Sequence, residues 1–131
     1  MMTDPIADFL IQIKNGYMAG IKKVSIPQSR MKEALANLLK KEGYLRDVKV
    51  KEVTEVKKNL ELELFYQNKQ PKLKEIKIIS KPGRRYYIKK GEVPKVLGGL
   101  GIAVISTCIG LITGNEAKKK NLGGELICKI W

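Results

Sequence analysis

The segment from Gly98 to Cys108 constrains the fold of this chain more than any other stretch. It begins with three glycines and continues through a short apolar run at residues 102–105. Isoleucine and valine favour a pleated, buried surface, so this run is predicted to form an inner strand. The strand ends in Ser106, Thr107 and Cys108, whose short polar groups can bring a partner close to the main chain. An ordinary turn after a buried strand has the same sequence pattern, so both interpretations stay open at this point.

The rest of the chain offers little for catalysis. There is no histidine, which removes the commonest general base and a common metal ligand. Paired carboxylates, a complete Walker loop and known nucleophile motifs are also missing. The glycines of residues 98–101 differ from a dinucleotide-binding loop because the apolar strand follows them instead of preceding them. The two cysteines, Cys108 and Cys128, are too few for a disulfide framework or a structural zinc site and are predicted to be partly buried. We therefore expect no enzyme, metal or cofactor, with a nucleotide-handling enzyme as the alternative.

Charge points to a polyanionic partner. The chain has 26 Lys and Arg against 13 Asp and Glu, a net charge of +13, and such an excess is usually retained because a polyanion neutralises it. Residues 1–64 hold 12 basic and 9 acidic residues (+3), whereas residues 65–131 hold 14 and 4 (+10). A cationic half with Tyr86 and Tyr87 suits irregular RNA, whose exposed bases can stack. Duplex DNA and membrane surfaces are less favoured, because no helix-turn-helix, zinc finger or basic amphipathic helix is evident.

The first half is predicted to alternate helices and strands. A helix is expected over residues 4–19, with Asp4 as its cap and Pro5 at its first position. A short strand at residues 23–26 precedes a second helix from Ser29 to Glu42, whose apolar face includes Met31 and which Gly43 ends. Lys14 and Asn15 fall off the apolar stripe of the first helix and are expected to be exposed. Residues 44–56 and 60–64 are predicted to form an antiparallel hairpin.

The second half is predicted to be rich in strands. Strands are expected at residues 74–80, 86–88 and 125–131, and Lys81-Pro82-Gly83 should form a turn. Tyr86 and Tyr87 would then point to opposite faces, with one of them in the core. Thr113 and Glu116 match a capping box, which indicates a short helix carrying the lysines that follow. The predicted fold class is α+β: an N-terminal α-β-α-β-β unit (residues 1–66) packed closely on a β-rich unit with one short helix (residues 67–131).

These residues together resemble a known family, bacterial-type small-subunit ribosomal protein eight. The opening and the middle agree through Asp4-Pro5-Ile6-Ala7-Asp8, Asn15, Pro27, Lys32, Glu33 and Glu42-Gly43-Tyr44. The last third carries the most specific matches, which are Lys81-Pro82-Gly83, Arg85, Tyr87, Glu92-Val93-Pro94, Gly99-Leu100-Gly101-Ile102-Ala103, Ser106-Thr107, Thr113, Glu116-Ala117, Gly123-Gly124-Glu125-Leu126 and Trp131. The resemblance covers essentially the whole chain.

The resemblance implies a structural constituent of the small ribosomal subunit in two tightly associated units. Members of this family are primary binders of the central domain of small-subunit ribosomal RNA. They help to nucleate assembly and lie beside neighbouring ribosomal proteins. In many bacteria they also repress their own operon by binding a similar messenger RNA structure. No membrane and no small-molecule substrate is expected, and the location would be the cytoplasm or an organellar stroma or matrix. The N-terminus, with Asp4 and Asp8 in place of a basic and then apolar signal, agrees with that location.

The resemblance also places the RNA site. The family's contact loop reads Ser-Thr-Ser and aligns with Ser106-Thr107-Cys108, so Cys108 replaces a hydroxyl with a weaker donor. Gly114-Asn115 stands where the family usually has Asp-Arg, which removes one cation. Tyr87 and Glu125 are expected to hold this loop or contact bases. The full predicted set of RNA-binding residues is Ser106, Thr107, Cys108, Tyr87, Glu125, Arg85, Lys118, Lys119 and Lys120, with Lys14, Asn15 and Lys32 as a weaker second patch.

Overall fold

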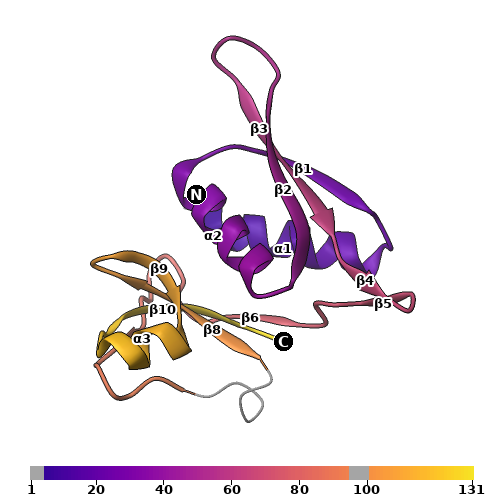
Figure 1. The fold of residues 1–131 in the computed structure, drawn as a ribbon. Coiled ribbons are helices and arrows are strands. Elements are labelled where there is room, and N and C mark those ends of the chain that lie inside the picture. Colours follow the sequence, from indigo (N-terminus) through magenta and orange to yellow (C-terminus); the bar gives the residue numbers. More distant parts are fainter. Residues whose placement is uncertain (1–4, 95–100) are drawn as a thin grey trace. The chain divides into compact units, whose positions relative to one another are not determined.

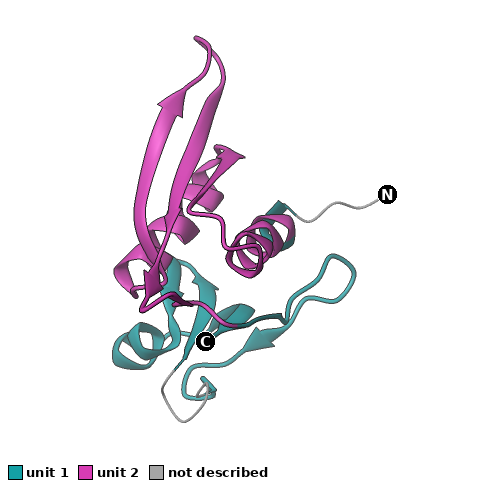
Figure 2. Ribbon diagram, turned by 90° about the vertical axis from the view of Figure 1, so that its right-hand side faces the viewer, with its two compact units in different colours: residues 1–7, 75–131 teal, residues 8–74 magenta. Residues whose placement is uncertain are grey.

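The structure is a computed structural model that describes residues 5–94 and 101–131. The chain divides into two compact units, one of residues 8–74 and one of residues 75–131 with residues 1–7 (Figure 2). We call these the N-terminal unit and the C-terminal unit. The expected cap Asp4 and the glycines Gly98 and Gly99 lie outside the described residues.

The N-terminal unit is a three-stranded antiparallel sheet covered by two helices (Figure 1). Its order along the chain is α1 (Pro5–Met18), β1 (Lys23–Pro27), α2 (Arg30–Lys41), β2 (Leu45–Glu52) and β3 (Lys58–Leu64). Strand β3 lies in the middle, between β1 and β2. Burial alternates along β3, so Leu60, Leu62 and Leu64 face the core. The predicted order of elements in this half is confirmed.

Helix α2 begins and ends where its sequence predicts. The Ser29 side-chain oxygen accepts a hydrogen bond from the Lys32 N–H at 3.2 Å, and Gly43 has a φ of +84° just past the C-terminal end. Leu35 and Leu39 are fully buried. Met31 is exposed, contrary to the prediction, because it lies in the first turn and the buried part of the helix begins one turn later.

A small hairpin of β4 (Tyr66–Gln67) and β5 (Gln70–Pro71) follows β3. Asn68 and Lys69 between them both have positive φ angles, of 53° and 63°, as in the tight turn that matches strand twist. The expected boundary between residues 66 and 67 falls inside β4.

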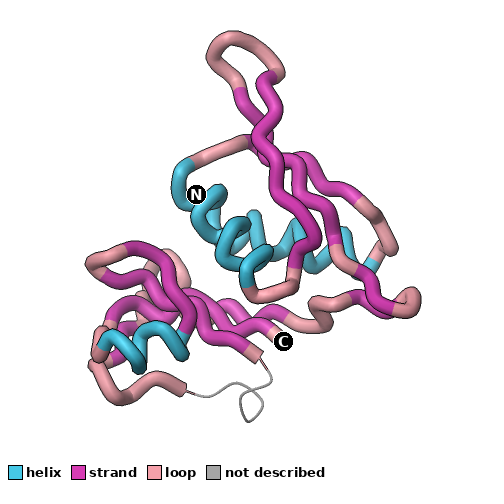
Figure 3. The backbone as a smooth tube through the Cα atoms, viewed as in Figure 1, coloured by secondary structure: helices cyan, strands magenta, loops and turns pink. Residues whose placement is uncertain are grey.

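The C-terminal unit is a five-stranded sheet built around its last strand. The elements are β6 (Ile76–Ile78), β7 (Tyr87–Ile88), β8 (Ile102–Thr107), β9 (Gly110–Thr113), α3 (Gly114–Lys120) and β10 (Gly124–Ile130). Strand β10 pairs with β8 on one side and with β6 and β7 on the other, and β9 pairs with β8. All these pairs are antiparallel. Strand β8 is therefore an inner strand, as predicted, and the α+β class is confirmed (Figure 3).

One face of this sheet packs on α3. Ala117 of α3 joins Ala103, Ile105, Ile112 and Leu126 in one buried cluster. Thr113 caps the helix by accepting a hydrogen bond from the Glu116 N–H at 3.3 Å, which confirms the predicted cap. Because strand residues alternate, Ser106 and Glu125 belong to the opposite face of the sheet.

Three predictions in this unit are wrong or incomplete. Both Tyr86 and Tyr87 are exposed, because β7 starts only at Tyr87 and Ile88 takes the buried position. The cysteines are not alike: Cys128 is buried in the middle of β10, whereas Cys108 is exposed in the turn after β8. Strand β9 was not predicted, although residues 109–113 contain three residues that favour strands.

Candidate RNA interface

Three of the predicted site residues form one row across the C-terminal sheet. In the pairing of β10 with its neighbours, Glu125 lies opposite Tyr87 of β7 on one side and opposite Ser106 of β8 on the other. Directly paired residues of antiparallel strands project from the same face. We call Tyr87, Glu125 and Ser106 the polar row. The structure thus brings together residues that stand up to 38 positions apart in the sequence.

The carboxylate in the middle of the polar row is incompletely paired. The side chain of Glu125 is 19% exposed, and its Oε2 atom is buried without a hydrogen-bond partner. Arg85 places its Nη1 atom 3.5 Å from that oxygen, which is an ion pair but lacks hydrogen-bond geometry. Glu125 therefore holds Arg85 beside the polar row, and the exposed part of its side chain is open to a ligand.

The two neighbours of Glu125 in the polar row present free groups. Tyr87 is 70% exposed, so its ring is open to stacking. Ser106 is half-buried, and its hydroxyl makes no hydrogen bond with the part of the chain that the structure describes. A hydroxyl can donate and accept at once. The polar row therefore offers a ring, an acceptor and a hydroxyl on one surface.

Thr107 has a different role from Ser106. Its hydroxyl donates to the Gly110 carbonyl oxygen at 2.9 Å and accepts from the Ile109 N–H at 3.3 Å. These bonds close the turn between β8 and β9, where Gly110 has a φ of +116° that glycine tolerates best. Cys108 and Ile109 form the exposed tip of this turn. Thr107 shapes the loop that was predicted to contact RNA, and its side chain alternates to the face opposite Ser106.

Two glycines allow the strands of the site to approach closely. A Cβ atom on Gly124 would lie 2.1 Å from the Ser106 carbonyl oxygen, and one on Gly123 would lie 2.5 Å from the Ile88 carbonyl oxygen. Real Cβ atoms do not come this close to backbone atoms. The Gly123-Gly124 pair therefore determines how β7 and β8 flank β10.

More cations flank Tyr87 in the sequence than were predicted to contact RNA. Residues 81–90 include the predicted Arg85 and four further cations, and all five are exposed: Lys81, Arg84, Arg85, Lys89 and Lys90. The turn is closed by reciprocal hydrogen bonds between the Lys81 and Arg84 backbones, at 3.1 and 2.9 Å. The buried Ser80 hydroxyl accepts a hydrogen bond from the Tyr86 N–H at 2.9 Å and so orders the return of this loop. The high density of Lys and Arg in residues 81–90 could have predicted that this stretch contributes further phosphate contacts.

The predicted lysine cluster lies on α3. Lys118, Lys119 and Lys120 are all exposed and occupy the last turn, where cations are favoured by the helix dipole. Gly114 at the start of α3 is buried, and a Cβ there would lie 2.8 Å from Val93 Cγ1. Close packing on Val93 therefore accompanies the departure from the family's usual residue at position 114.

The second predicted patch belongs to the N-terminal unit and is not part of the polar row. Asn15 on α1 is exposed, as predicted, while Lys14 is half-buried instead of exposed. Lys32, in the first turn of α2, is also half-buried. These three residues come from two helices of that unit.

Among the described residues, no group of three or more His, Cys, Asp or Glu side chains could hold a metal ion. The same part of the chain contains no helix that is long and apolar enough to cross a membrane.

The polar row and the exposed cations of the same unit belong to a two-unit α+β protein, and its sequence relatives place that protein in a family. The chain matches the family described as "Ribosomal protein S8" over residues 4–131. It is 48% identical to "Small ribosomal subunit protein uS8" of Oleidesulfovibrio alaskensis over 131 residues, which is the full length of both chains. It is 50% identical to the protein of the same name from Moorella thermoacetica, with 99% of this chain and 100% of the relative covered. The relative from Tolumonas auensis is 49% identical, with 98% of each chain covered.

The chain therefore belongs to the ribosomal protein S8 family. It is a structural ribosomal protein and not an enzyme. Both conclusions confirm what the sequence resemblance predicts.

Proposed function

We propose that this protein is a constituent of the small ribosomal subunit in the cytoplasm and binds the central domain of small-subunit ribosomal RNA directly. Binding would take place at the polar row and the turn after β8, with Arg85 and the α3 lysines attracting phosphates. Its early attachment would help the subunit to assemble. The names of the relatives support membership of the small ribosomal subunit. The arrangement of the C-terminal unit supports RNA as the ligand.

The observation that carries this proposal is the polar row, in which Glu125 lies between the exposed ring of Tyr87 and the hydroxyl of Ser106. RNA supplies suitable donors, namely the amino groups of bases and the 2′-hydroxyl of ribose. A phosphate supplies none, so Glu125 would select for bases or sugars and not for the backbone charge. Tyr87 can stack on an unpaired base beside it. An irregular RNA helix with accessible bases fits this chemistry better than a regular duplex.

Glu125→Ala tests the role of the acceptor. We expect the affinity for the cognate hairpin of the central domain to fall at least tenfold, because the contact is a charge-assisted hydrogen bond of about 1.5–3 kcal/mol. Glu92→Ala is the control, since it removes one negative charge from an exposed site in the same unit and should leave affinity unchanged or slightly raised. Filter binding or fluorescence anisotropy on the cognate and a scrambled hairpin measures both. Equal affinities of the Glu125 and Glu92 variants for the cognate hairpin would contradict the proposal.

Footprinting on deproteinised small-subunit RNA locates the binding site. We expect protection in the central domain by the purified protein alone, because a primary binder needs no other protein. Protection that appears only with other ribosomal proteins present would instead indicate an architectural protein that binds its neighbours. The same assay on the messenger RNA of its own operon tests the repressor role that the family resemblance implies.

A further inference from the structure

The β2–β3 hairpin of the N-terminal unit carries an exposed apolar tip. The hairpin projects well past α1 and α2 (Figures 1 and 3). Val50, Val53 and Val56 are 43%, 59% and 91% exposed. Burial alternates along β3, so its leucines face the helices. At the tip of the β2–β3 hairpin, no helix covers the apolar side chains. Single exposed valines are common, whereas three close together on a projecting element indicate an interaction surface.

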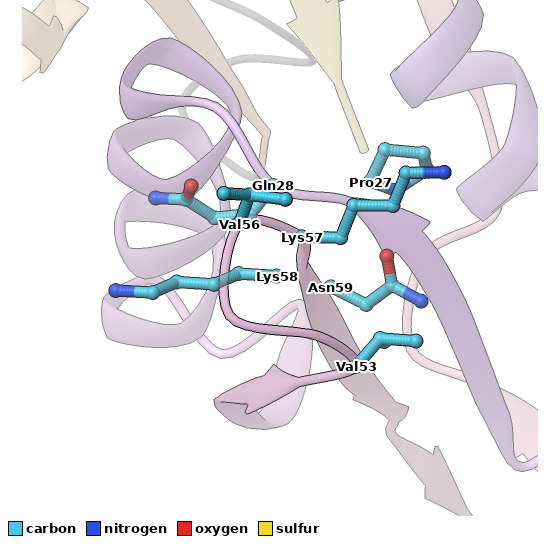
Figure 4. Close-up of a pocket in the computed structure, with 7 residues that line it drawn as sticks. All are labelled: Pro27, Gln28, Val53, Val56, Lys57, Lys58 and Asn59. Atoms are coloured by element: carbon cyan, nitrogen blue, oxygen red, sulfur yellow. The ribbon is translucent and has the colours of Figure 1, made fainter.

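A pocket of about 660 Å³ lies beside this tip (Figure 4). Its lining combines two of the valines with the end of β1 and the start of β3: Pro27, Gln28, Val53, Val56, Lys57, Lys58 and Asn59. We call these seven residues the tip pocket. Pro27 and the two valines supply its apolar part, and the side-chain amides of Gln28 and Asn59 supply polar groups. Such a mixture of apolar walls and a few polar groups is typical of binding sites.

The tip pocket is held in shape by hydrogen bonds. Thr54 closes the turn, because its hydroxyl accepts from the Lys57 N–H at 3.0 Å and the Lys57 carbonyl oxygen accepts from the Val53 N–H at 2.9 Å. The Gln28 N–H donates to the Lys58 carbonyl oxygen at 2.9 Å, and the Gln28 side-chain amide donates to Glu33 at 2.8 Å. Val56 is therefore exposed on a turn whose conformation is fixed by hydrogen bonds. A preformed surface loses less conformational entropy on binding.

The charge of the tip pocket is positive. Lys57 and Lys58 line it, and no carboxylate does. Within the described residues neither ammonium group has a carboxylate within 4.0 Å, whereas Lys51 and Lys23 on the same sheet both pair with Glu61. Glu52 and Glu55 belong to the hairpin but do not line the pocket. The pocket thus favours an apolar occupant that carries carboxylates at its edge.

The residue types argue for a protein occupant instead of RNA. RNA sites use aromatic rings and arginine planes for stacking, as in residues 84–87 of the C-terminal unit, and the tip pocket has neither. Valine and proline gain most from contact with other aliphatic side chains. We propose that the tip pocket docks a segment of a neighbouring protein in the assembled particle, with aliphatic side chains on the valines and Asp or Glu on Lys57 and Lys58. This inference rests on the proposed function, because it takes the particle as the setting.

A competition experiment tests this inference. Isotope-labelled wild-type protein and an equal amount of unlabelled V53D/V56D variant are assembled with small-subunit RNA, once alone and once with the full set of other small-subunit proteins. Mass spectrometry then gives the ratio of the two forms in the isolated particles. We expect a ratio near one on RNA alone and at least a tenfold preference for the wild type with the other proteins present. Met18→Asp, which replaces an exposed apolar residue of α1 in the same unit, is the matched control and should compete equally in both arms.

The remaining outcomes overturn one proposal or the other. A ratio near one in both arms would refute docking at the tip pocket while leaving RNA binding intact. The same preference in both arms would mean that the tip contacts RNA, and it would equally refute a protein occupant. If neither form binds RNA alone, the proposed function fails first. Lys57→Glu with Lys58→Glu should reproduce the loss in the second arm, and circular dichroism confirms that each variant is folded.

Discussion

Gly124 is the residue at which one added methyl group should do most damage to the candidate site. The Cβ of Gly124→Ala would lie 2.1 Å from the Ser106 carbonyl oxygen, so β8 and β10 must separate. We expect a loss of about 1–3 kcal/mol in the free energy of unfolding, as is typical of overpacking. RNA affinity should fall as well, because the polar row spans these two strands.

Gly83→Ala is the control for that substitution. A Cβ at Gly83 meets nothing within 4 Å, and its φ is not positive. Urea unfolding of both variants checks the prediction. Equal stability of the Gly124 variant and the wild type would mean that the strands are not in close contact at this point.

At the scale of single residues, the sequence predicts a set of RNA-binding side chains, and the structure shows which of them are neighbours. The family resemblance singled out Glu125 and Tyr87, and strand pairing shows that they are neighbours. Thr107 was expected to face RNA together with Ser106, yet its hydroxyl is occupied within the turn. Hydrogen bonds between a side chain and a backbone carbonyl three residues away depend on turn geometry, which residue types do not specify.

At the scale of elements, the tyrosine on α1 links three segments of the N-terminal unit. The Tyr17 hydroxyl donates to the Tyr44 carbonyl oxygen and accepts from the Phe65 N–H at 3.0 Å. Its ring also packs against Tyr66, with centroids 5.4 Å apart. Tyr17→Phe removes both hydrogen bonds and leaves their partners unsatisfied, so we expect a loss of about 1–3 kcal/mol in stability at neutral pH. Chemical denaturation measures it, and Tyr87→Phe, which alters an exposed hydroxyl, should be neutral.

The same tyrosine predicts sensitivity to alkali. Burial raises the pKa of Tyr17 from 10.0 to about 12, despite the hydrogen bond from Phe65. Because the pKa of Tyr17 is higher in the folded than in the unfolded state, the contribution of the protonated hydroxyl to stability is complete below pH 10. This contribution is lost as the pH rises towards 12. Stability measured between pH 9 and 12 should therefore fall less steeply in Tyr17→Phe than in the wild type. Parallel curves for the two proteins would contradict this assignment.

Elements with their own end signals were predicted well. Helices α2 and α3 have side-chain caps that can be recognised locally, at Ser29 and Thr113. Strand β9 was missed, and β7 was predicted to begin one residue early, at Tyr86, because both strands depend on pairing with β8 and β10. Exposure of both Tyr86 and Tyr87 could not be predicted for the same reason, since the alternation begins only where pairing begins.

At the scale of the whole molecule, net charge sets how the protein responds to salt. The chain carries +13, most of it in residues 65–131, and phosphate contacts make binding weaken as salt rises. Lys119→Ala should weaken binding to cognate and scrambled hairpins about equally and reduce the slope of log affinity against log salt by about 1. Binding titrations between 50 and about 300 mM salt measure the slope. An unchanged slope would remove Lys119 from the phosphate contacts.

Because one of the two cysteines is exposed and the other is buried, the folded protein has a single thiol that is accessible to reagents. Burial raises the pKa of the Cys128 thiol to about 12 and keeps it from reagents, whereas Cys108 is exposed in the turn beside the polar row. A thiol reagent should consequently count one group in the native chain and two after denaturation. Because Cys108 lies in the turn proposed to contact RNA, a bulky group attached to it should weaken RNA binding, and this test needs no engineered cysteine.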